Sequence, residues 1–402
     1  MREASMREAS TREASTREAS TREGALQDWL RAHGSVLVGF SGGVDSAYLA
    51  TVAVETLGRE RVLAVIGRSA SYPSSQWATA RAVADRFAVP VLEVDTDEMN
   101  DPRYAANPVN RCYFCKSELW SRLVPIAAER GLAVVIDGTN ADDTTDYRPG
   151  AVAARELAVA SPLAEAGLTK AHIRLLSQRR GIPTWSQPAS PCLSSRLPYG
   201  TAVTPARLAK VERAEASLRD LGVAGDLRVR YHDDVARVEI GIEVLQQWLE
   251  FESTVQIAVA VRDAGFPRVA IDLRGFRSGS LNVLGGVSSP SGQEAHGQQQ
   301  RAVASVDEPS SPEDRALELQ HALAARGLHA HVEVRGALAI LVGVSAAAPI
   351  DSVARRHVVR AAQAAGFSHV ALEVGGFLDM ARLGFPGRDT ARHATLPGVS
   401  PA

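Results

Sequence analysis

Cysteine, net charge and long apolar runs are scarce in this 402-residue sequence, and each scarcity excludes a class of protein. Three cysteines are too few for a disulfide scaffold and favour a reducing compartment, so we expect a cytoplasmic protein that keeps its thiols for chemistry. No run of about 18 apolar residues is present, which excludes a membrane-spanning helix. A formal net charge of −2 does not support a strongly basic nucleic-acid-binding protein. The 45% of hydrophobic residues suffices for two or three domains of about 150 residues.

Changes in composition divide the chain into segments. Residues 1–23 repeat a five-residue unit (MREAS, TREAS) whose period matches neither helix nor strand, so we expect a disordered or marginally helical lead. Residues 24–204 alternate short apolar runs with helical stretches, which predicts an α/β domain with a parallel sheet. Residues 205–284 predict a smaller α+β domain. Residues 285–312 are rich in Gly, Ser, Gln and Pro and predict a flexible linker.

The last segment, residues 313–402, resembles the second domain. The stretch AGFPRVAIDLRGF at 264–276 matches AGFSHVALEVGGF at 365–377, and the apolar positions agree. The arginines of the first stretch and its flank, Arg274 and Arg277, have no counterpart in the second. Because the apolar periodicity survives while these charges vanish, we predict a degenerate copy that has lost its site and serves a structural or regulatory role.

A phosphate-binding loop is predicted at residues 40–46, which read FSGGVDS between a buried strand and a helix. The two glycines let backbone N–H groups approach an anion, and the helix N-terminus adds its partial positive charge. The two serines can donate to phosphate oxygens, and the aspartate suits a Mg²⁺ carried by the phosphates. The string is neither a Walker A loop nor a GxGxxG fingerprint, and its strand–loop–helix context argues against an ordinary glycine turn. The residues assigned to this loop are Ser41, Gly42, Gly43, Asp45 and Ser46.

The three cysteines form a CxxC pair, Cys112 and Cys115 in NRCYFCK, and a distant Cys192 in SPCLSSR. A CxxC pair can be half of a zinc site, a redox pair or a coincidence, but no second CxxC or paired histidine motif completes a zinc site, and a redox pair leaves Cys192 unexplained. Three thiolates could hold a 4Fe–4S cluster with one iron lacking a protein ligand. Alternatively, Cys192 acts alone as a nucleophile or sulfur donor. Neighbouring Lys116 and Arg196 would favour the thiolate form.

Together, the FSGGVDS loop, NRCYFCK, PASPCLSSR and RVRYHDDVARVEI resemble the LarE family of ATP-dependent sulfur-insertion enzymes, within the PP-loop ATPases. The resemblance covers residues 24–284. It implies an α/β fold: a parallel-sheet PP-loop domain of the adenine nucleotide alpha-hydrolase type, followed by a smaller α+β domain, which is repeated here in degenerate form. It also implies cleavage of ATP, with Mg²⁺, to AMP and pyrophosphate.

The substrate that the resemblance implies is pyridinium-3,5-biscarboxylic acid mononucleotide, in the synthesis of the nickel-pincer cofactor of lactate racemase. A carboxylate is adenylylated, and sulfur then replaces AMP to give a thiocarboxylate. In one branch of the family, the cysteine of the PCLSSR-type segment gives up its own sulfur. In the other branch, this cysteine and a CxxC pair hold a 4Fe–4S cluster that relays sulfide. With Cys112, Cys115 and Cys192, the chain resembles the second branch.

The resemblance also assigns binding residues. Those expected at the nucleotide, at the carboxyl ends of the second and fourth strands, are Ser69, Gly138, Thr139 and Asn140. Those expected at the substrate are Lys116, Arg196, Arg228, Arg230, Glu239, Arg274 and Arg277. Because Arg228 and Arg230 are two residues apart on a predicted strand, their side chains point to one face and can converge on one phosphate.

Three other functions fit parts of the pattern. An amidotransferase-type synthetase would need an ammonia source, and no glutaminase domain is apparent. A tRNA thiolase would need a basic surface, which the net charge of −2 does not favour. A non-catalytic nucleotide or sulfide sensor would not need an intact loop beside all three cysteines. The expected partners are a small nucleotide substrate, a sulfide donor and the other enzymes of nickel-pincer cofactor synthesis, with a homo-oligomer left open.

Overall fold

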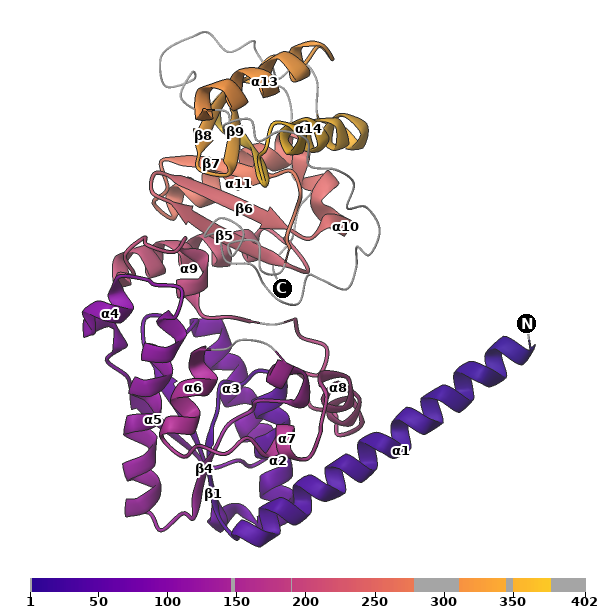
Figure 1. Ribbon diagram of the computed structural model, residues 1–402, viewed down its shortest axis with the longest axis vertical. Helices are drawn as coiled ribbons and strands as arrows, with labels where there is room; N and C mark the ends of the chain where they lie inside the picture. The colour runs from indigo at the N-terminus through magenta and orange to yellow at the C-terminus, as the bar shows by residue number, and fades with distance from the viewer. Residues whose placement is uncertain (1, 146–148, 189, 278–310, 345–349, 377–402) are drawn as a thin grey trace, which may run out of the picture.

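The computed structural model describes residues 2–145, 149–188, 190–277, 311–344 and 350–376. These residues form a parallel-sheet domain and a second sheet domain, joined through the segment that precedes helix α9(Pro205–Asp220) (Figure 1). No helix among these residues is long and apolar enough to cross a bilayer.

The first domain contains a four-stranded sheet in the order β3-β2-β1-β4, and every neighbouring pair is parallel. Its strands are β1(Val36–Gly39), β2(Val62–Arg68), β3(Val91–Asp95) and β4(Val134–Ile136). The α/β fold predicted from the alternation of apolar runs and helical stretches is therefore confirmed. The strand order reverses between β1 and β4, and open α/β sheets bind ligands at the carboxyl ends of the strands at such a point.

Helices cover both faces of this sheet, because successive strand residues point to opposite sides. Val36 and Val38 of β1 pack with α2, α3 and α8 in one core cluster, whereas Leu37 packs with α5 and α6 in another. The helices are α2(Val44–Leu57), α3(Ser74–Arg86), α5(Arg111–Glu129), α6(Pro149–Glu156) and α8(Lys170–Arg179), with the short α4(Pro102–Ala105) and α7(Pro162–Glu165) between them.

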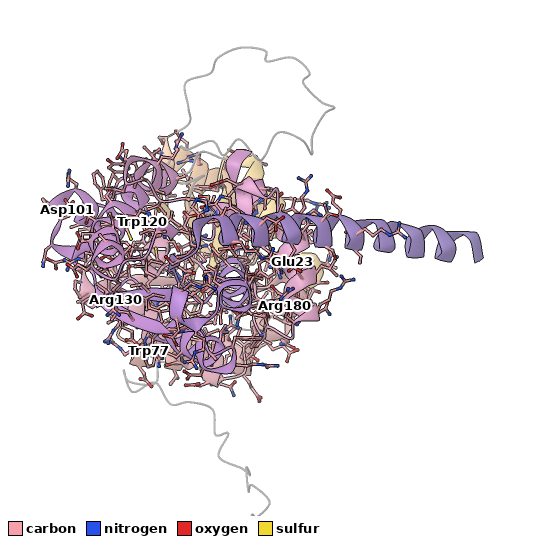
Figure 2. All side chains as sticks on the ribbon, turned by 90° about the horizontal axis from the view of Figure 1, so that it is seen from below. Glu23, Trp77, Asp101, Trp120, Arg130 and Arg180 are labelled. Atoms are coloured by element: carbon pink, nitrogen blue, oxygen red, sulfur yellow. The ribbon has the colours of Figure 1, made fainter. Side chains whose placement is uncertain are left out.

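The repeat expected to be disordered or marginally helical lies in one helix, α1(Arg2–His33), that projects from the domain (Figure 1). Ala, Arg and Glu have high helix propensity, so a helix can form without a consistent apolar face. In its second half, Leu26 and Leu30 are buried in the core. Glu23 forms an ion pair of 2.7 Å with Arg180, which also anchors α1 to the domain (Figure 2).

The second sheet has six strands in the order β5-β6-β7-β10-β9-β8. They are β5(Leu227–His232), β6(Val235–Ile240), β7(Arg268–Asp272), β8(His331–Arg335), β9(Leu338–Val342) and β10(His369–Val374). Helices α9 and α11(Phe251–Asp263) belong to the first three strands, with α10(Ile242–Leu245) between them, and α13(Pro312–Ala324) and α14(Ser352–Ala364) belong to the last three. We call residues 205–277 the first repeat and residues 311–376 the second repeat.

The two repeats have the same order of elements, helix–strand–strand–helix–strand, and share one sheet. They meet where β7 pairs antiparallel with β10, and their helices pack on one face in a single core cluster. The predicted linker, residues 285–312, lies outside the described residues except for its last two. The division into domains predicted from the sequence puts a boundary inside what is one continuous sheet.

Candidate active site

The loop after β1 has the geometry expected of a phosphate cradle. Gly43 is the extended residue that precedes α2, so the first backbone N–H groups of the helix point out of its N-terminus. The hydroxyls of Ser41 and Ser46 lie 3.1 Å apart, and Ser46 Oγ accepts from the Ser41 N–H at 3.2 Å. The carbonyl of Ser41 accepts from the Tyr72 hydroxyl at 2.9 Å, which holds the loop against the segment after β2.

Glycine is required at position 42 for two separate reasons. Its φ of +69° lies in the left-handed region, which side chains with a Cβ rarely adopt. A Cβ there would also lie 2.5 Å from the Cβ of Ala80 on α3. The phosphate loop can therefore pass close to α3 only because this residue has no side chain.

Asp45 projects from the first turn of α2 toward the loop that follows β4. Its Oδ2 pairs with Lys170 Nζ at 2.6 Å, while Oδ1 is buried and has no hydrogen-bond partner among the described residues. A carboxylate oxygen without a donor suits a hard cation, so the site fits the Mg²⁺ expected with ATP. The backbone N–H of Lys170 in turn donates to Asp142 at 2.8 Å.

The loop after β4 lies directly against the phosphate loop. A Cβ on Gly138 would lie 3.1 Å from the backbone nitrogen of Ser46. Thr139 donates to Asp137 through its N–H and its hydroxyl, and the Asn140 side chain accepts from the N–H of Asp142 at 3.0 Å. These local hydrogen bonds hold the loop rigid. Thus the structure brings Gly138, Thr139 and Asn140 to the same sheet edge as the phosphate loop.

The segment after β2 links this edge to the third cysteine. Ser69 and Ser71 share a hydrogen bond of 2.9 Å between their hydroxyls, and the Ser71 hydroxyl donates to Glu98 at 3.0 Å. The carbonyl of Ser71 accepts from the N–H of Leu193 at 2.8 Å. Cys192 directly precedes Leu193, so the cysteine lies at the nucleotide edge of the sheet.

The CxxC pair lies at the N-terminal end of α5. Cys192 comes from a later segment and lies close enough to Cys115 to affect its pKa. Cys112 is exposed, whereas Cys115 and Cys192 are half-buried. Burial raises the pKa of the Cys115 thiol, and the nearby Glu98 and Cys192 raise it further. Burial also raises the pKa of Tyr104, as do Cys192 and Cys115. These mutual effects place Cys115, Cys192 and Tyr104 in one electrostatic neighbourhood.

The donor set fits an iron–sulfur cluster better than a single metal ion. Zn–S bonds of about 2.3 Å would bring the sulfur atoms of a mononuclear site within about 4 Å of one another. In the described part of the chain, no three cysteine ligand atoms are gathered this closely. Three thiols from two segments, which are not gathered around one metal-ion position, suit a larger multi-iron group.

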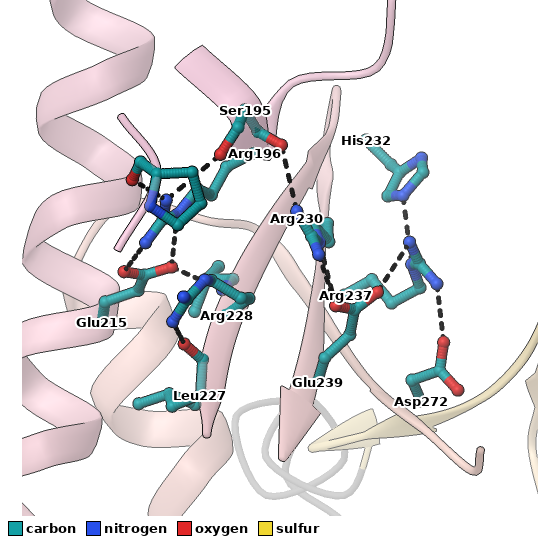
Figure 3. Close-up of polar contacts among 12 residues, drawn as sticks. Ser195, Arg196, Glu215, Leu227, Arg228, Arg230, His232, Arg237, Glu239 and Asp272 are labelled. Carbon is teal, nitrogen blue, oxygen red and sulfur yellow. Dashed lines mark hydrogen bonds and ion pairs between the residues drawn. The ribbon is translucent and has the colours of Figure 1, made fainter. Parts of the chain in front are cut away.

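A short 3-10 turn, η4(Leu193–Arg196), connects the cysteines to the second domain (Figure 3). Arg196 is buried and binds Glu215 of α9 through two hydrogen bonds of 2.9 Å, and its Nη1 donates to the carbonyl of Cys192 at 3.1 Å. The hydroxyl of Ser194 lies 2.7 Å from that of Tyr104. Arg196, expected at the substrate, therefore also fixes the position of Cys192.

The paired arginines of β5 lie beside this turn. Arg230 donates to the carbonyl of Ser195 at 3.0 Å and pairs with Glu239 at 2.8 Å, and both charged side chains are buried. Burial lowers the pKa of Arg228 to about 10, and the positive charge of Arg196 acts in the same direction. The structure thus gathers Arg196, Arg228, Arg230 and Glu239, as Figure 3 shows.

Charges of both signs meet in this cluster. Four arginines (Arg196, Arg228, Arg230 and Arg237) lie among four carboxylates (Glu215, Asp226, Glu239 and Asp272). Burial lowers the pKa of Arg228, and the neighbouring Arg196 and Arg230 lower it further, so an anion beside Arg228 would stabilise its charged form. The cluster is therefore suited to a phosphate or carboxylate group.

Arg237 occupies the place where a cation could otherwise bind. Ligand atoms of Glu239, Asp272 and His369 lie within 4.8 Å of one another and all three residues are buried. However, the Arg237 guanidinium already lies 2.6 Å from Asp272 and 3.1 Å from Glu239. We therefore interpret this group as an ion-pair network.

Of the other expected substrate residues, Lys116 lies on α5, whereas Arg274 and Arg277 adjoin this cluster. Lys116 packs over the Trp120 ring at 4.9 Å, one turn along α5 from Cys112. Arg274 and Arg277 follow β7, at the seam between the two repeats. The Arg274 N–H donates to Asp272 at 2.8 Å, and the charges of Asp272 and Glu239 act on Arg277, so these two arginines adjoin the ion-pair network beside Arg230.

Four residues that the sequence did not single out belong to the site: Glu98, Tyr104, Lys170 and Glu215. Glu98 is buried beside Cys115, and its Oε2 has no hydrogen-bond partner in the described ranges. Lys170 had one sequence signal, since the chain has only three lysines. Glu98, Tyr104 and Glu215 join the site through contacts with residues far away in the sequence, so no local sequence pattern marks them.

A parallel sheet whose first strand enters a helix through a Gly-Gly loop, with polar loops at its carboxyl edge, defines a PP-loop enzyme that uses ATP and Mg²⁺. Residues 22–111 match the NAD synthase family. The pyridinium-3,5-bisthiocarboxylic acid mononucleotide synthase of Lactiplantibacillus plantarum is 38% identical over 258 residues, which cover 64% of this chain and 91% of that protein. An uncharacterised protein of Synechocystis is 45% identical over 246 residues, covering 61% and 91%.

A more distant relative, the ammonia-dependent NAD⁺ synthetase of Methanosarcina mazei, is 31% identical over 160 residues, covering 37% of this chain and 59% of that protein. The similarity to the Lactiplantibacillus synthase is greater and spans almost that whole protein. The chain belongs to the LarE family of PP-loop sulfurtransferases, as the motifs predicted.

Proposed function

We propose that this enzyme inserts sulfur into pyridinium-3,5-biscarboxylic acid mononucleotide for nickel-pincer cofactor synthesis. ATP adenylylates a substrate carboxylate and releases pyrophosphate, and a sulfide then displaces AMP to leave a thiocarboxylate. The observation that supports this most strongly is η4, which contacts the nucleotide edge, Tyr104 beside the CxxC pair and the arginine cluster at once. Adenylate, sulfur source and substrate anion would meet at this turn.

The first domain carries the ATP step. The phosphate loop and the N-terminus of α2 would hold the pyrophosphate moiety, and Ser41 and Ser46 would donate to its oxygens. Asp45 would bind Mg²⁺ through Oδ1, while Lys170, already paired with Oδ2, would offset the phosphate charge. These groups stabilise pyrophosphate as a leaving group, because they are already arranged around the charge that develops on it.

The sulfur step belongs to the three cysteines. Cys112, Cys115 and Cys192 would hold a 4Fe–4S cluster, which when bound supplies an iron lacking a protein ligand for an external sulfide. Burial raises the pKa of Cys115, so this residue favours the neutral thiol until a positively charged group displaces its proton. Arg196 and Ser194 keep Cys192 in place through η4.

The second domain would anchor the substrate. Arg228 and Arg230 point to one face of β5 and would bind the nucleotide phosphate, with Glu239 holding Arg230 in position. A sulfide donor, other cofactor-synthesis enzymes and a cytoplasmic location remain predictions from the sequence.

The test of this proposal is nucleotide product analysis with the biscarboxylate mononucleotide as substrate. The expected products are AMP and pyrophosphate in amounts equal to the carboxylate consumed, and Asp45→Ala should slow Mg²⁺-dependent turnover. Lys210→Ala serves as a control, since Lys210 packs on Phe266 in the second domain. Release of ADP and orthophosphate would contradict the proposal.

A further inference from the structure

A cavity of about 320 Å³ lies at the seam between the two repeats. All the charged residues among the described residues that line it are arginines. Arg274 and Arg277 come from the segment after β7, and Arg355, Arg356 and Arg360 come from α14 of the second repeat. Among the described residues that line it, none is acidic. We call this cavity the seam pocket.

Reciprocal contacts between the repeats build the seam pocket. Arg355 of the second repeat donates through Nη1 to the carbonyl of Leu273 in the first, at 2.9 Å. Arg274 of the first repeat donates through Nη1 to the carbonyl of Ser368 in the second. Each repeat thus holds an arginine of the other, so the pocket exists only where both are present.

The arginines of the pocket are not fully compensated within the described chain. Nε and Nη2 of Arg277 and Nε of Arg355 are buried and have no hydrogen-bond partner in the described residues. Burial lowers the pKa of Arg277 although Asp272 acts in the opposite direction, and burial and Arg356 lower the pKa of Arg355. Arg356 and Arg360 are four residues apart on α14, a spacing at which like charges destabilise a helix. A bound anion would remove these costs.

These charges are specific to the second repeat. When the repeats are aligned through the AGF triplet after α11 and α14, the first repeat has uncharged residues at the three α14 positions. Thr254, Val255 and Val259 correspond to Arg355, Arg356 and Arg360. Copying of the first repeat therefore does not account for the arginines. The second repeat, which lacks counterparts of Arg274 and Arg277, carries a different positive group.

We propose that the seam pocket binds a phosphorylated small molecule of mononucleotide size or smaller. Guanidinium groups match phosphate oxygens through paired hydrogen bonds, and five of them exceed what one phosphate needs. The volume lies at the lower end of the range of small-ligand sites, which begins near about 300 Å³. The inference does not rest on the proposed function, because the ligand class follows from the lining alone.

Pyrophosphate, ATP and the biscarboxylate mononucleotide share this chemistry, so the experiment titrates each of them separately into the full chain by calorimetry. The phosphate loop and the arginine cluster are also proposed anion sites, so the readout is the number of sites per chain for each probe. The variant Arg356→Glu with Arg360→Glu changes two exposed side chains of α14. Arg59→Glu with Arg130→Glu makes the same change in charge on exposed residues of the first domain.

We expect the α14 variant to lose one site, or to weaken it at least a hundredfold, for the probe that the seam pocket prefers. The first-domain variant should keep all sites, and both variants should still form AMP and pyrophosphate. Equal numbers of sites in wild type and the α14 variant for every probe would overturn the proposal. So would an equal loss in both double variants, which would show a general effect of charge. Failure of AMP formation in wild type would contradict the proposed function alone.

Discussion

The two repeats of the second domain share a fold but place charge at different positions. Both hairpins close with a two-residue turn, so their registers correspond, and Arg230, Arg237 and Glu239 of the first repeat match Glu333, Ile340 and Val342 of the second. Apolar side chains and a reversed charge thus replace the buried ion-pair network. On the helices the difference is opposite, since Arg355, Arg356 and Arg360 of α14 have uncharged residues at the matching positions of α11.

The comparison shows how a duplicated fold can lose one site and gain another. The residues that build the helix-covered core are apolar in both copies, and they keep the sheet continuous. Strand residues alternate between faces, and on the other face the first repeat has the buried ion-pair network, whereas Ile340 of the second repeat packs in a small apolar cluster. The second repeat therefore supports the first through β10 while its arginines serve the seam pocket.

Deletion of the second repeat is expected to have the largest effect. Removing residues 311–402 leaves β7 without its antiparallel partner β10 and exposes core residues such as Ile271 and Leu273. An exposed apolar edge strand promotes association between chains. We expect the shortened chain to aggregate or to lose cooperative unfolding of the second domain, measured by light scattering and calorimetry. A monodisperse shortened chain with an unchanged melting temperature would show that the repeats are independent.

Replacing Arg237 by the residue of the second repeat is expected to cost about 3–5 kcal/mol of unfolding free energy, because Arg237→Ile leaves Glu239 and Asp272 buried without their shared cation. The double change Arg237→Ile with Asp272→Asn should cost less, since it also removes the charge of the carboxylate that pairs with Arg237, while Glu239 keeps its ion pair with Arg230. Ile340→Val in the second repeat is the control, with about 0.5–1.5 kcal/mol expected. Denaturant unfolding measures all three, and a loss below 1 kcal/mol for Arg237→Ile would contradict the account.

Substrate binding should distinguish the copies next. A charge-assisted hydrogen bond to phosphate contributes roughly 1.5–3 kcal/mol, so Arg228→Ala should weaken binding of the biscarboxylate mononucleotide about tenfold to a hundredfold. ATP affinity should stay nearly unchanged, because the phosphate loop lies in the first domain. His331→Ala, at the matching position of β8, should change neither affinity. Calorimetric titration would contradict the assignment if His331→Ala had the larger effect.

The smallest expected effect is the pH dependence that His369 contributes. Burial and the nearby Arg237 lower its pKa to about 2, against about 6.5 in an unfolded chain. Below pH 6.5 the unfolded state therefore binds more protons, and stability is lost as the pH falls. We expect the unfolding free energy of wild type to fall by about 1 kcal/mol more than that of His369→Gln between pH 7 and pH 5.5. An equal fall in both proteins would show that His369 is not buried neutral.

Sequence patterns predicted the parts of the site that are local. The whole string FSGGVDS, between an apolar run and a helical stretch, predicts a loop between a strand and a helix, and the structure places this loop as expected. Ser69 and Gly138 follow strands of a parallel sheet, so their shared edge follows from topology. The three cysteines were predicted as a set because the chain has no others.

Contacts between distant segments could not be predicted in the same way. The pairing of Lys170 with Asp45 depends on where α8 packs, and no pattern near either residue encodes it. The similarity of the repeats indicated a copied fold but not that β10 would pair with β7. For α1, periodicity suggested no buried face, and the high helix propensity of its residues decided the outcome.

The central claim is that an external sulfide replaces AMP at a substrate carboxylate while the three cysteines survive. One anaerobic reaction with isotopically labelled sulfide, reconstituted enzyme, ATP and the biscarboxylate mononucleotide tests it, when the product and the intact chain are both weighed by mass spectrometry. The account predicts labelled sulfur in the thiocarboxylate and an unchanged chain mass. Unlabelled sulfur in the product, with a chain lighter by about 34 Da through loss of H₂S from Cys192, would contradict it.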